Sequence, residues 1–206
     1  MEFEFKGNRL KFDKELSNLD KLVLKFVKVL DAQHVDYVII SGYIAILFGR
    51  SRNTEDVDLF VEEMPKEQFI LLWNALGEAG FECINAGAAE SAYEEYLKDQ
   101  LAIRFAVLGT IEPNFELKFP KTKYNRYSLK NKLFVELNGE ELRTSELELQ
   151  IAFKLYLGAD KDLEDARHLY KVFKEHLNIG LMQAHIQALG VAKQAERILW
   201  KDKYQS

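Results

Sequence analysis

The chain has 206 residues, 48% hydrophobic and 30% charged, which is enough to bury a substantial core in one domain or two small ones. A net charge of −5 argues against a protein that coats nucleic acid through general basicity, and the single cysteine excludes an intramolecular disulfide and a cysteine-rich zinc site. No apolar run approaches the roughly 20 residues of a membrane span, and the N-terminus does not resemble a signal peptide, so we expect a cytoplasmic protein without a membrane partner.

Alternating strand and helix patterns run through the first 84 residues. Apolar residues at spacings of three and four indicate an amphipathic helix over 17–32, and the run Val38-Ile39-Ile40 is typical of a strand covered on both faces. The expected elements are a short hairpin or an ordered arm (2–12), a helix (17–32), a strand (35–41), a short buried helix (43–48), a strand (56–61), a helix (65–79) and a short strand (81–84).

The pattern changes from strands to helices near Ser145. Asn138-Gly139 is a strong hairpin signal, and Ser145 followed by Glu148 has the spacing of a capping box. The expected elements are strands (101–108 and 114–119), a solvated basic loop (121–132), a hairpin (133–143) and helices (145–158, 160–177 and one or two within 179–202). These patterns predict an α+β fold, a mixed β-sheet flanked by helices and followed by a C-terminal helical segment, with domains at residues 1–144 and 145–206.

Asp56 and Asp58 are the leading candidates for chemistry. Residues two apart on a strand point to the same face, so these carboxylates sit side by side while Val57 and Leu59 point into the core. Two close carboxylates repel each other unless a cation or a proton lies between them, and Mg²⁺ prefers carboxylate oxygens. Exposed acids at a strand edge are a common alternative. The surrounding turn and basic residues favour metal-dependent phosphoryl or nucleotidyl chemistry.

Polar and basic residues near this pair suit a phosphate site. Ser41-Gly42 lies where a strand meets a helix, and backbone N–H groups there can hold phosphate oxygens, although a plain turn is the commoner explanation. Arg50 and Arg52 suit triphosphate oxygens through forked hydrogen bonds, or they neutralise the nearby acids. Thr54 is expected to order the loop through the backbone. We include all five residues in the expected nucleotide-binding set.

A third carboxylate is needed for two-metal nucleotidyl transfer, and Glu116 is the best candidate. It lies in Phe-Glu-Leu-Lys-Phe, an apolar–acid–apolar strand pattern like that of the first pair, with Lys118 on the same face. A solvent-facing Glu–Lys pair explains the pattern equally well. Asp99 and Glu112 are weaker candidates because both lie at strand ends or turns.

Lys118 and two lysines of the C-terminal helices complete the expected nucleotide-binding set. Lys154 lies in an otherwise apolar helix and shares a face with Glu146 and Gln150, which suits either the lining of a cleft or a solvated stripe. Lys161 opens the next helix, where pairing with Asp165 at i,i+4 explains it without a functional role.

Two segments together resemble the nucleotidyltransferase superfamily of DNA polymerase β. The first is Ser41-Gly42 followed by Arg52-Asn53-Thr54-Glu55-Asp56-Val57-Asp58-Leu59. Within the superfamily, the likeness is to small prokaryotic members related to abortive-infection toxins. The second segment, 147–154 with 161–166, is similar to the helical part that follows the catalytic domain in that group. The resemblance covers about residues 36–172 and implies a nucleotidyltransferase-like sheet with three acids at one edge.

The resemblance also implies roles for individual residues. Asp56 and Asp58 would hold Mg²⁺ (or Mn²⁺), with Glu116 as a third ligand. The residues facing the phosphates would be Ser41, Gly42, Arg52, Lys154 and Lys161. Two positions depart from the family pattern. The usual Gly-Gly or Gly-Ser is Ser-Gly-Tyr here, which places a bulky Tyr43 beside the turn, and Arg104 stands where an acid is expected.

Two functional hypotheses follow. The first is an enzyme that moves a nucleoside monophosphate from an NTP to an acceptor hydroxyl and releases pyrophosphate. The second is a degenerate transferase, a nucleotide-binding or regulatory module of the toxin–antitoxin kind that pairs with a partner protein. The acceptor stays open among a small molecule, RNA and protein. The basic segment 121–132, with Tyr124 and Tyr127, suits RNA or a solvated loop.

Overall fold

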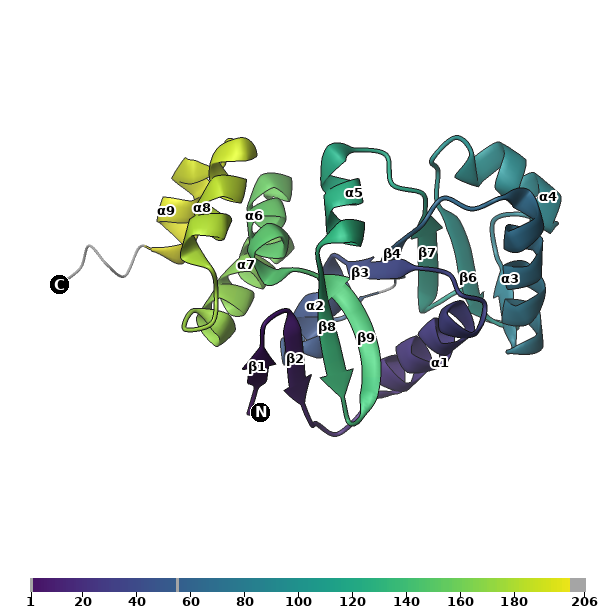
Figure 1. Ribbon diagram of the computed structural model, residues 1–206, viewed down its shortest axis with the longest axis horizontal. Coiled ribbons are helices and arrows are strands. Elements are labelled where there is room, and N and C mark those ends of the chain that lie inside the picture. The colour runs from purple at the N-terminus through teal and green to yellow at the C-terminus, as the bar shows by residue number, and fades with distance from the viewer. Residues whose placement is uncertain (1, 55, 201–206) are drawn as a thin grey trace.

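A single mixed sheet organises the molecule. In the computed structural model, which describes residues 2–54 and 56–200, the strands of those residues form a nine-stranded sheet in the order β1-β2-β8-β9-β3-β4-β7-β6-β5 (Figure 1). The strands are β1 (Glu4–Lys6), β2 (Arg9–Phe12), β3 (Tyr37–Ile40), β4 (Asp56–Val61), β5 (Phe81–Cys83), β6 (Ile103–Val107), β7 (Asn114–Lys118), β8 (Lys132–Leu137) and β9 (Glu140–Ser145). Helices flank this sheet, which confirms the predicted α+β class.

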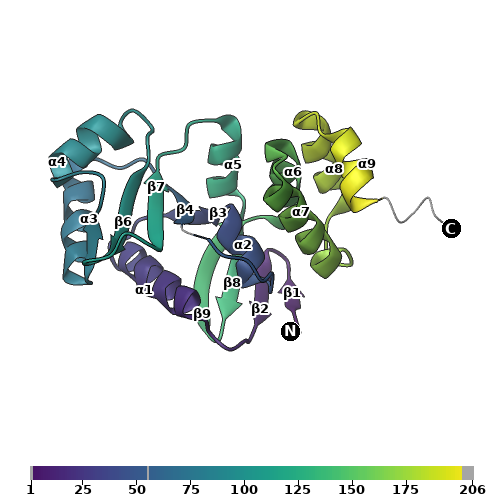
Figure 2. The same cartoon turned by 180° about the vertical axis from the view of Figure 1, so that it is seen from behind.

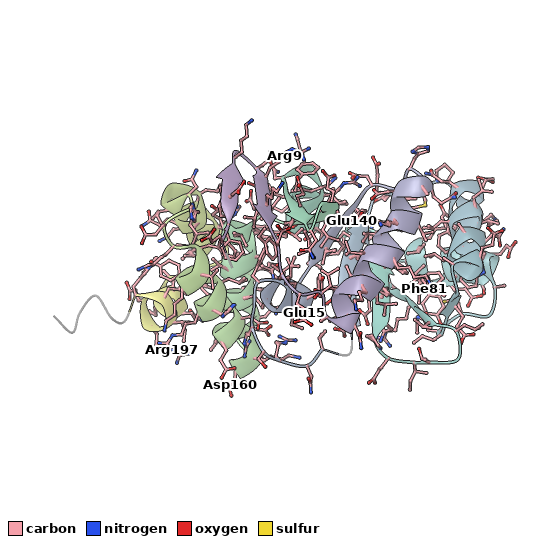
Figure 3. All side chains as sticks on the ribbon, turned by 90° about the horizontal axis from the view of Figure 1, so that it is seen from below. Arg9, Glu15, Phe81, Glu140, Asp160 and Arg197 are labelled. Atoms are coloured by element: carbon pink, nitrogen blue, oxygen red, sulfur yellow. The ribbon has the colours of Figure 1, made fainter. Side chains whose placement is uncertain are left out.

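Helices connect the strands and follow the last of them. They are α1 (Asn18–Ala32), α2 (Gly42–Leu47), α3 (Lys66–Glu78), α4 (Ala89–Ser91), the π-helix η1 (Ala92–Leu97), α5 (Lys123–Lys130), α6 (Leu147–Leu157), α7 (Asp160–Phe173), α8 (Ile179–Ala188) and α9 (Ala192–Leu199). The last four gather at one end of the molecule, where Asp160 lies, and Phe81 lies at the opposite end (Figure 3). The domain boundary at residue 145 stays a prediction.

The two faces of the sheet centre differ in chemistry. Val57 and Leu59 of β4 and Phe115 of β7 are fully buried on one face, where Phe26 of α1 stacks on Phe115 with ring centroids 3.9 Å apart. Strand alternation therefore turns the intervening acids of β4 and β7 to the other face. That face is covered by α5 and α6 rather than by α1.

The short helix α2 is held in place by a buried polar cluster. Asp20 of α1 is fully buried and accepts hydrogen bonds from the Tyr43 hydroxyl at 2.8 Å and the Lys14 ammonium at 3.0 Å. Lys14 also donates to the Leu47 carbonyl, at the end of α2. Asp20 and Ser17 form the capping box of α1. Tyr43 thus points into the core, away from the strand-to-helix turn, and its bulk is no obstacle to a ligand there.

Replacing Asp20 by asparagine should lower stability by roughly 3 kcal/mol at pH 7, because a charged acceptor is lost from a buried cluster. Burial opposes ionisation, but hydrogen bonds from Ser17, Lys14 and Tyr43 lower the pKa of Asp20 below its ordinary value. A lowered folded-state pKa stabilises the protein above the unfolded pKa of about 3.9, and the stabilisation is lost as pH falls through the folded value. Urea unfolding from pH 7 to pH 3 should therefore show the difference between wild type and variant shrinking in acid.

The exposed Asp13 provides the control for this experiment. Asp13→Asn removes a carboxylate from the same segment without touching the buried cluster, so its unfolding curve should follow wild type at every pH. A constant difference between wild type and Asp20→Asn across the pH range would contradict the role given to the Asp20 charge.

Three local predictions need correction. Residues 121–132 are not a loop, because Thr122 and Asn125 form a capping box that starts α5. Ser145 does not cap α6. It belongs to β9, and the N-cap residue of α6 is Glu146. Helix α7 ends at Phe173 rather than 177. The last two residues of the expected helical region, 201–202, lie outside the described residues. Within the described part, the helices are too short or too polar to cross a membrane.

Candidate active site at the centre of the sheet

The acidic residues come together on the central strands β4 and β7. These strands are parallel neighbours, and their register places Asp58 opposite Glu116 and Asp56 opposite Asn114. β4 is flanked by β3 on its other side, so its backbone is hydrogen-bonded on both edges. Glu116 therefore lies beside Asp58 on the face away from α1. Thr54 donates to the Asp56 carbonyl at 2.9 Å and orders the start of the strand.

Lys118 lies between two of these carboxylates. Its ammonium is 2.7 Å from Asp58 Oδ1 and 3.0 Å from Glu116 Oε2. Arg104 of β6 approaches the other oxygen of Glu116, with its Nη2 at 2.6 Å. Arg104, the residue found where the family pattern expects an acid, thus serves as a cation partner of Glu116. Two positive side chains offset the charge of the acidic pair.

The pKa values of the three groups reflect this arrangement. Burial raises the pKa of Asp58, although Lys118 opposes the shift. Burial also acts on Glu116, but Lys118 and Arg104 outweigh it and lower the pKa of that carboxyl. Burial works against the charge on Lys118, and Asp58 and Glu116 overcome it to raise the pKa of the ammonium. Glu116 is consequently held ionised, the form that binds a cation, and is a weak proton acceptor.

The carboxylates of Asp56, Asp58 and Glu116 suit a divalent cation once the Lys118 ammonium has moved away. Asp58 and Glu116 each place an oxygen within 3.0 Å of one positively charged nitrogen, so the protein's own ammonium stands where a shared cation would. Asp56 lies two residues before Asp58 on the same strand, and its negative charge adds to the burial that raises the pKa of Asp58. Among the described residues, no three His, Cys, Asp or Glu side chains converge as a complete metal site. A metal held by Asp56, Asp58 and Glu116 would therefore have to displace Lys118.

A cavity of about 270 Å³ opens directly above this cluster. It lies between the sheet and helices α5 and α6, and α5 stands between β7 and α6 in both views (Figures 1 and 2). Apolar and polar side chains both line it, and the polar ones come from the sheet and from both helices. The lining residues are Ile40, Ser41, Asp58, Phe60, Lys118, Tyr124, Asn125, Ser128, Ser145, Leu149, Gln150, Phe153, Lys154 and Leu157.

The turn between β3 and α2 forms part of the cavity wall. Ser41 has φ 65°, a conformation that glycine adopts easily and other residues rarely do, at the position where the family pattern has glycine. The Gln150 side-chain amide of α6 donates to the Ser41 carbonyl at 2.8 Å and ties the turn to the helix. Gln150 and Lys154 line the cavity, as one of the two sequence interpretations expects, whereas Glu146 bonds His185 instead.

Behind the turn, three basic side chains converge on one buried carboxylate. Asp165 of α7 is fully buried and pairs with Arg50, with Arg52 at 2.6 Å and with Lys154 at 2.9 Å. Arg50 also pairs with the exposed Glu164. Asp165 is a functional candidate that the sequence did not indicate, because its partners Arg50 and Arg52 are more than 110 residues away.

Of the eight expected nucleotide-binding residues, three line the cavity and five do not: Gly42, Arg50, Arg52, Thr54 and Lys161. Ser41, Lys118 and Lys154 line the cavity. Arg52 lies against Gly42, where an added Cβ would meet its Nη2 at 2.7 Å, so the glycine makes room for the guanidinium. Arg50 faces α7. Lys161 is exposed and contributes only its carbonyl, which accepts from Arg50.

Comparison with known proteins was made by sequence and by structure. No protein-family model matches the sequence, and a search of curated proteins finds no match. Several solved structures share the fold. An antigenic nucleotidyltransferase-like protein from Paracoccidioides brasiliensis is 16% identical, with a TM-score of 0.52 over 90% of this chain and 94% of that chain.

The antibiotic-resistance factor ANT(2'')-Ia matches in two structures. Its solution structure is 13% identical, with a TM-score of 0.54 over 88% of this chain and 97% of that chain. Its complex with adenylyl-2''-tobramycin is 12% identical, with a TM-score of 0.51 over 84% and 98% respectively. Likeness at such low identity concerns the backbone arrangement alone. By that arrangement, the chain has the mixed-sheet fold of nucleotidyltransferase-like proteins.

Proposed function

We propose that this protein is a metal-dependent nucleotidyltransferase that moves a nucleoside monophosphate from an NTP to an acceptor hydroxyl. The observation that carries this proposal is the convergence of Asp58 and Glu116 on one cationic nitrogen at the floor of the cavity. The position of Ser41 and Lys154 in the wall of the same cavity supports it, as does the likeness in fold to nucleotidyltransferase-like proteins.

The proposed roles follow from charge and position. Asp56, Asp58 and Glu116 would hold Mg²⁺ or Mn²⁺, which when bound supplies positive charge to the phosphates. The turn at Ser41 and the ammonium of Lys154 would orient the triphosphate from the wall of the cavity.

In the transfer itself, the acceptor oxygen bonds to the α-phosphorus and the bond from that phosphorus to the bridging oxygen breaks. Pyrophosphate leaves with the electron pair of the broken bond. The proton of the acceptor hydroxyl passes to a carboxylate of the acidic set.

The charges in the cavity lining do not select a class of acceptor. Among the described residues that line it, Asp58 is the only acid, and Lys118 and Lys154 are both basic. Both lysines are already paired, Lys118 with Asp58 and Glu116 and Lys154 with Asp162 and Asp165. Their charges are therefore offset within the wall and do not discriminate between cationic and anionic acceptors.

A second candidate is a nucleotide-binding module without transfer activity. It is favoured by the engagement of Glu116 with two cations, Arg104 and Lys118, which leaves this carboxylate less available to a metal.

Isothermal calorimetry with ATP, with and without Mg²⁺, separates the two candidates, together with pyrophosphate release from α-labelled NTPs. The transferase should bind ATP more tightly with Mg²⁺ than in EDTA, and it should lose pyrophosphate release in EDTA. Binding of equal strength with and without the metal, or an absence of binding, would favour the second candidate.

A further inference from the structure

The two cations at the acidic pair differ in what they contact. Lys118 contacts both Asp58 and Glu116, whereas Arg104 contacts Glu116 alone and its side chain is 50% exposed. Lys118 is thus the group that holds the two carboxylates together. A metal can keep Arg104 as a neighbour of Glu116, but it cannot share the position of the Lys118 ammonium, because two cations at that distance repel each other.

Lys118 also lines the cavity that would receive the nucleotide. Its side chain is 26% exposed, and a flexible four-carbon stem lets its ammonium turn from the sheet toward the cavity. An ammonium released from the carboxylates would be costly to leave partly buried and unpaired. A triphosphate in the cavity offers it a new anionic partner.

We propose that Lys118 is an internal counter-cation that couples metal binding to nucleotide binding. This inference rests on the proposed function and concerns the regulation of the same site. With both ligands absent, the ammonium neutralises Asp58 and Glu116. A metal that arrives alone must break these contacts without compensation. With nucleotide present, the ammonium transfers to phosphate, and the carboxylates are released to the metal.

Coupling of this kind is reciprocal. If nucleotide tightens metal binding by a given factor, the metal must tighten nucleotide binding by the same factor. Removing the ammonium should therefore have opposite effects on the two ligands measured separately. The metal alone should bind more tightly, because nothing competes for the carboxylates, and the nucleotide alone should bind more weakly, because one phosphate partner is lost. A lysine with a merely structural role would weaken both.

The test measures two affinities in Lys118→Met: Mn²⁺ alone, by electron paramagnetic resonance, and α,β-methylene-ATP in EDTA, by calorimetry. We expect the Mn²⁺ affinity to rise about 5- to 50-fold and the nucleotide affinity to fall about 5-fold or more. Lys118→Gln, which keeps hydrogen-bond donors between the carboxylates, serves if the methionine variant is poorly folded. Lys132→Met is the matched control, since it removes a strand lysine paired with Asp36 away from the cavity, and it should change neither affinity.

The outcomes separate this inference from the proposed function. Unchanged or weaker Mn²⁺ binding by both Lys118 variants would overturn the inference, even if the wild-type protein transfers nucleotide. Mn²⁺ binding by Lys118→Met but not by wild type would support the inference, even if no transfer is found. If wild-type protein releases no pyrophosphate, but Lys118→Met still binds Mn²⁺ more tightly and nucleotide more weakly, only the proposed function would be overturned.

Discussion

Asp58→Ala should reduce metal-dependent nucleotide transfer by at least about 10²-fold, because the removed carboxylate is the one that faces both Glu116 and the cavity. The fold should survive this change. The Lys118 ammonium keeps Glu116 as its partner at 3.0 Å, so no buried charge is left alone. Transfer of label from an α-labelled NTP and thermal unfolding, both measured on the same preparation, check the two parts of this prediction.

The pKa of Asp58 gives the sign of the stability change. Burial raises it above the ordinary value, so the folded state holds the ionised carboxylate less favourably than the unfolded chain does. Removing the charge should therefore leave the free energy of unfolding at pH 7 unchanged or raise it, by no more than about 1 kcal/mol. Glu62→Ala, which removes an exposed acid directly after β4, is the control and should leave transfer unchanged. Full transfer activity in Asp58→Ala would remove the basis of the proposed function.

Asp165→Ala should destabilise the protein by about 3–5 kcal/mol, the cost of breaking a buried ion pair by removing one partner. The carboxylate is fully buried, and its loss leaves Arg50, Arg52 and Lys154 without their shared counter-charge. Asp162 still pairs with Lys154 at 2.6 Å, but it does not reach the two arginines. Urea unfolding at pH 7 measures the change.

Glu164 provides a matched control one residue away. It also pairs with Arg50, but its side chain is 67% exposed, so solvent replaces the lost interaction. Glu164→Ala should therefore cost less than about 1 kcal/mol. Equal losses of stability in the two variants would contradict the explanation that burial makes the ion pairs of Asp165 more important than that of Glu164.

The strand that carries the acids could be predicted because strand periodicity is local. In residues 56–61, apolar positions alternate with Asp56 and Asp58, and the structure has β4 over the same residues. The position of Glu116 opposite Asp58 depends on which strands become neighbours, a choice made by the whole sheet. From the sequence, Glu116 could be predicted as the third carboxylate only because it lies between apolar strand residues.

The basic helix α5 was not predictable from periodicity. Ser128 is its only fully buried residue, so it carries no apolar stripe, and the exposed positions are lysines and arginine. The signal that fixes its start is the capping box of Thr122 and Asn125, in which asparagine replaces the usual Glu or Gln. Tyr124 and Asn125 were therefore missed as cavity residues.

Asp165 shows the limit of local charge rules. Its spacing from Lys161 predicts a pair within the helix, but the buried face of α7 turns Asp165 toward the distant Arg50 and Arg52. The i,i+4 expectation is wrong because burial makes the long-range partners stronger than a solvated neighbour. No spacing rule within one helix can reveal such partners.

The convergence of Arg50 and Arg52 on Asp165 also bears on the order in which the proposed site is completed during protein synthesis. The turn at residue 41, strands β4 and β7 and helices α5 and α6 supply the cavity lining, and α7 supplies the carboxylate shared by Arg50, Arg52 and Lys154. Contacts between such distant segments slow folding. A nascent chain that has not yet delivered residue 165 beyond the ribosome therefore leaves these three cations without their shared buried partner.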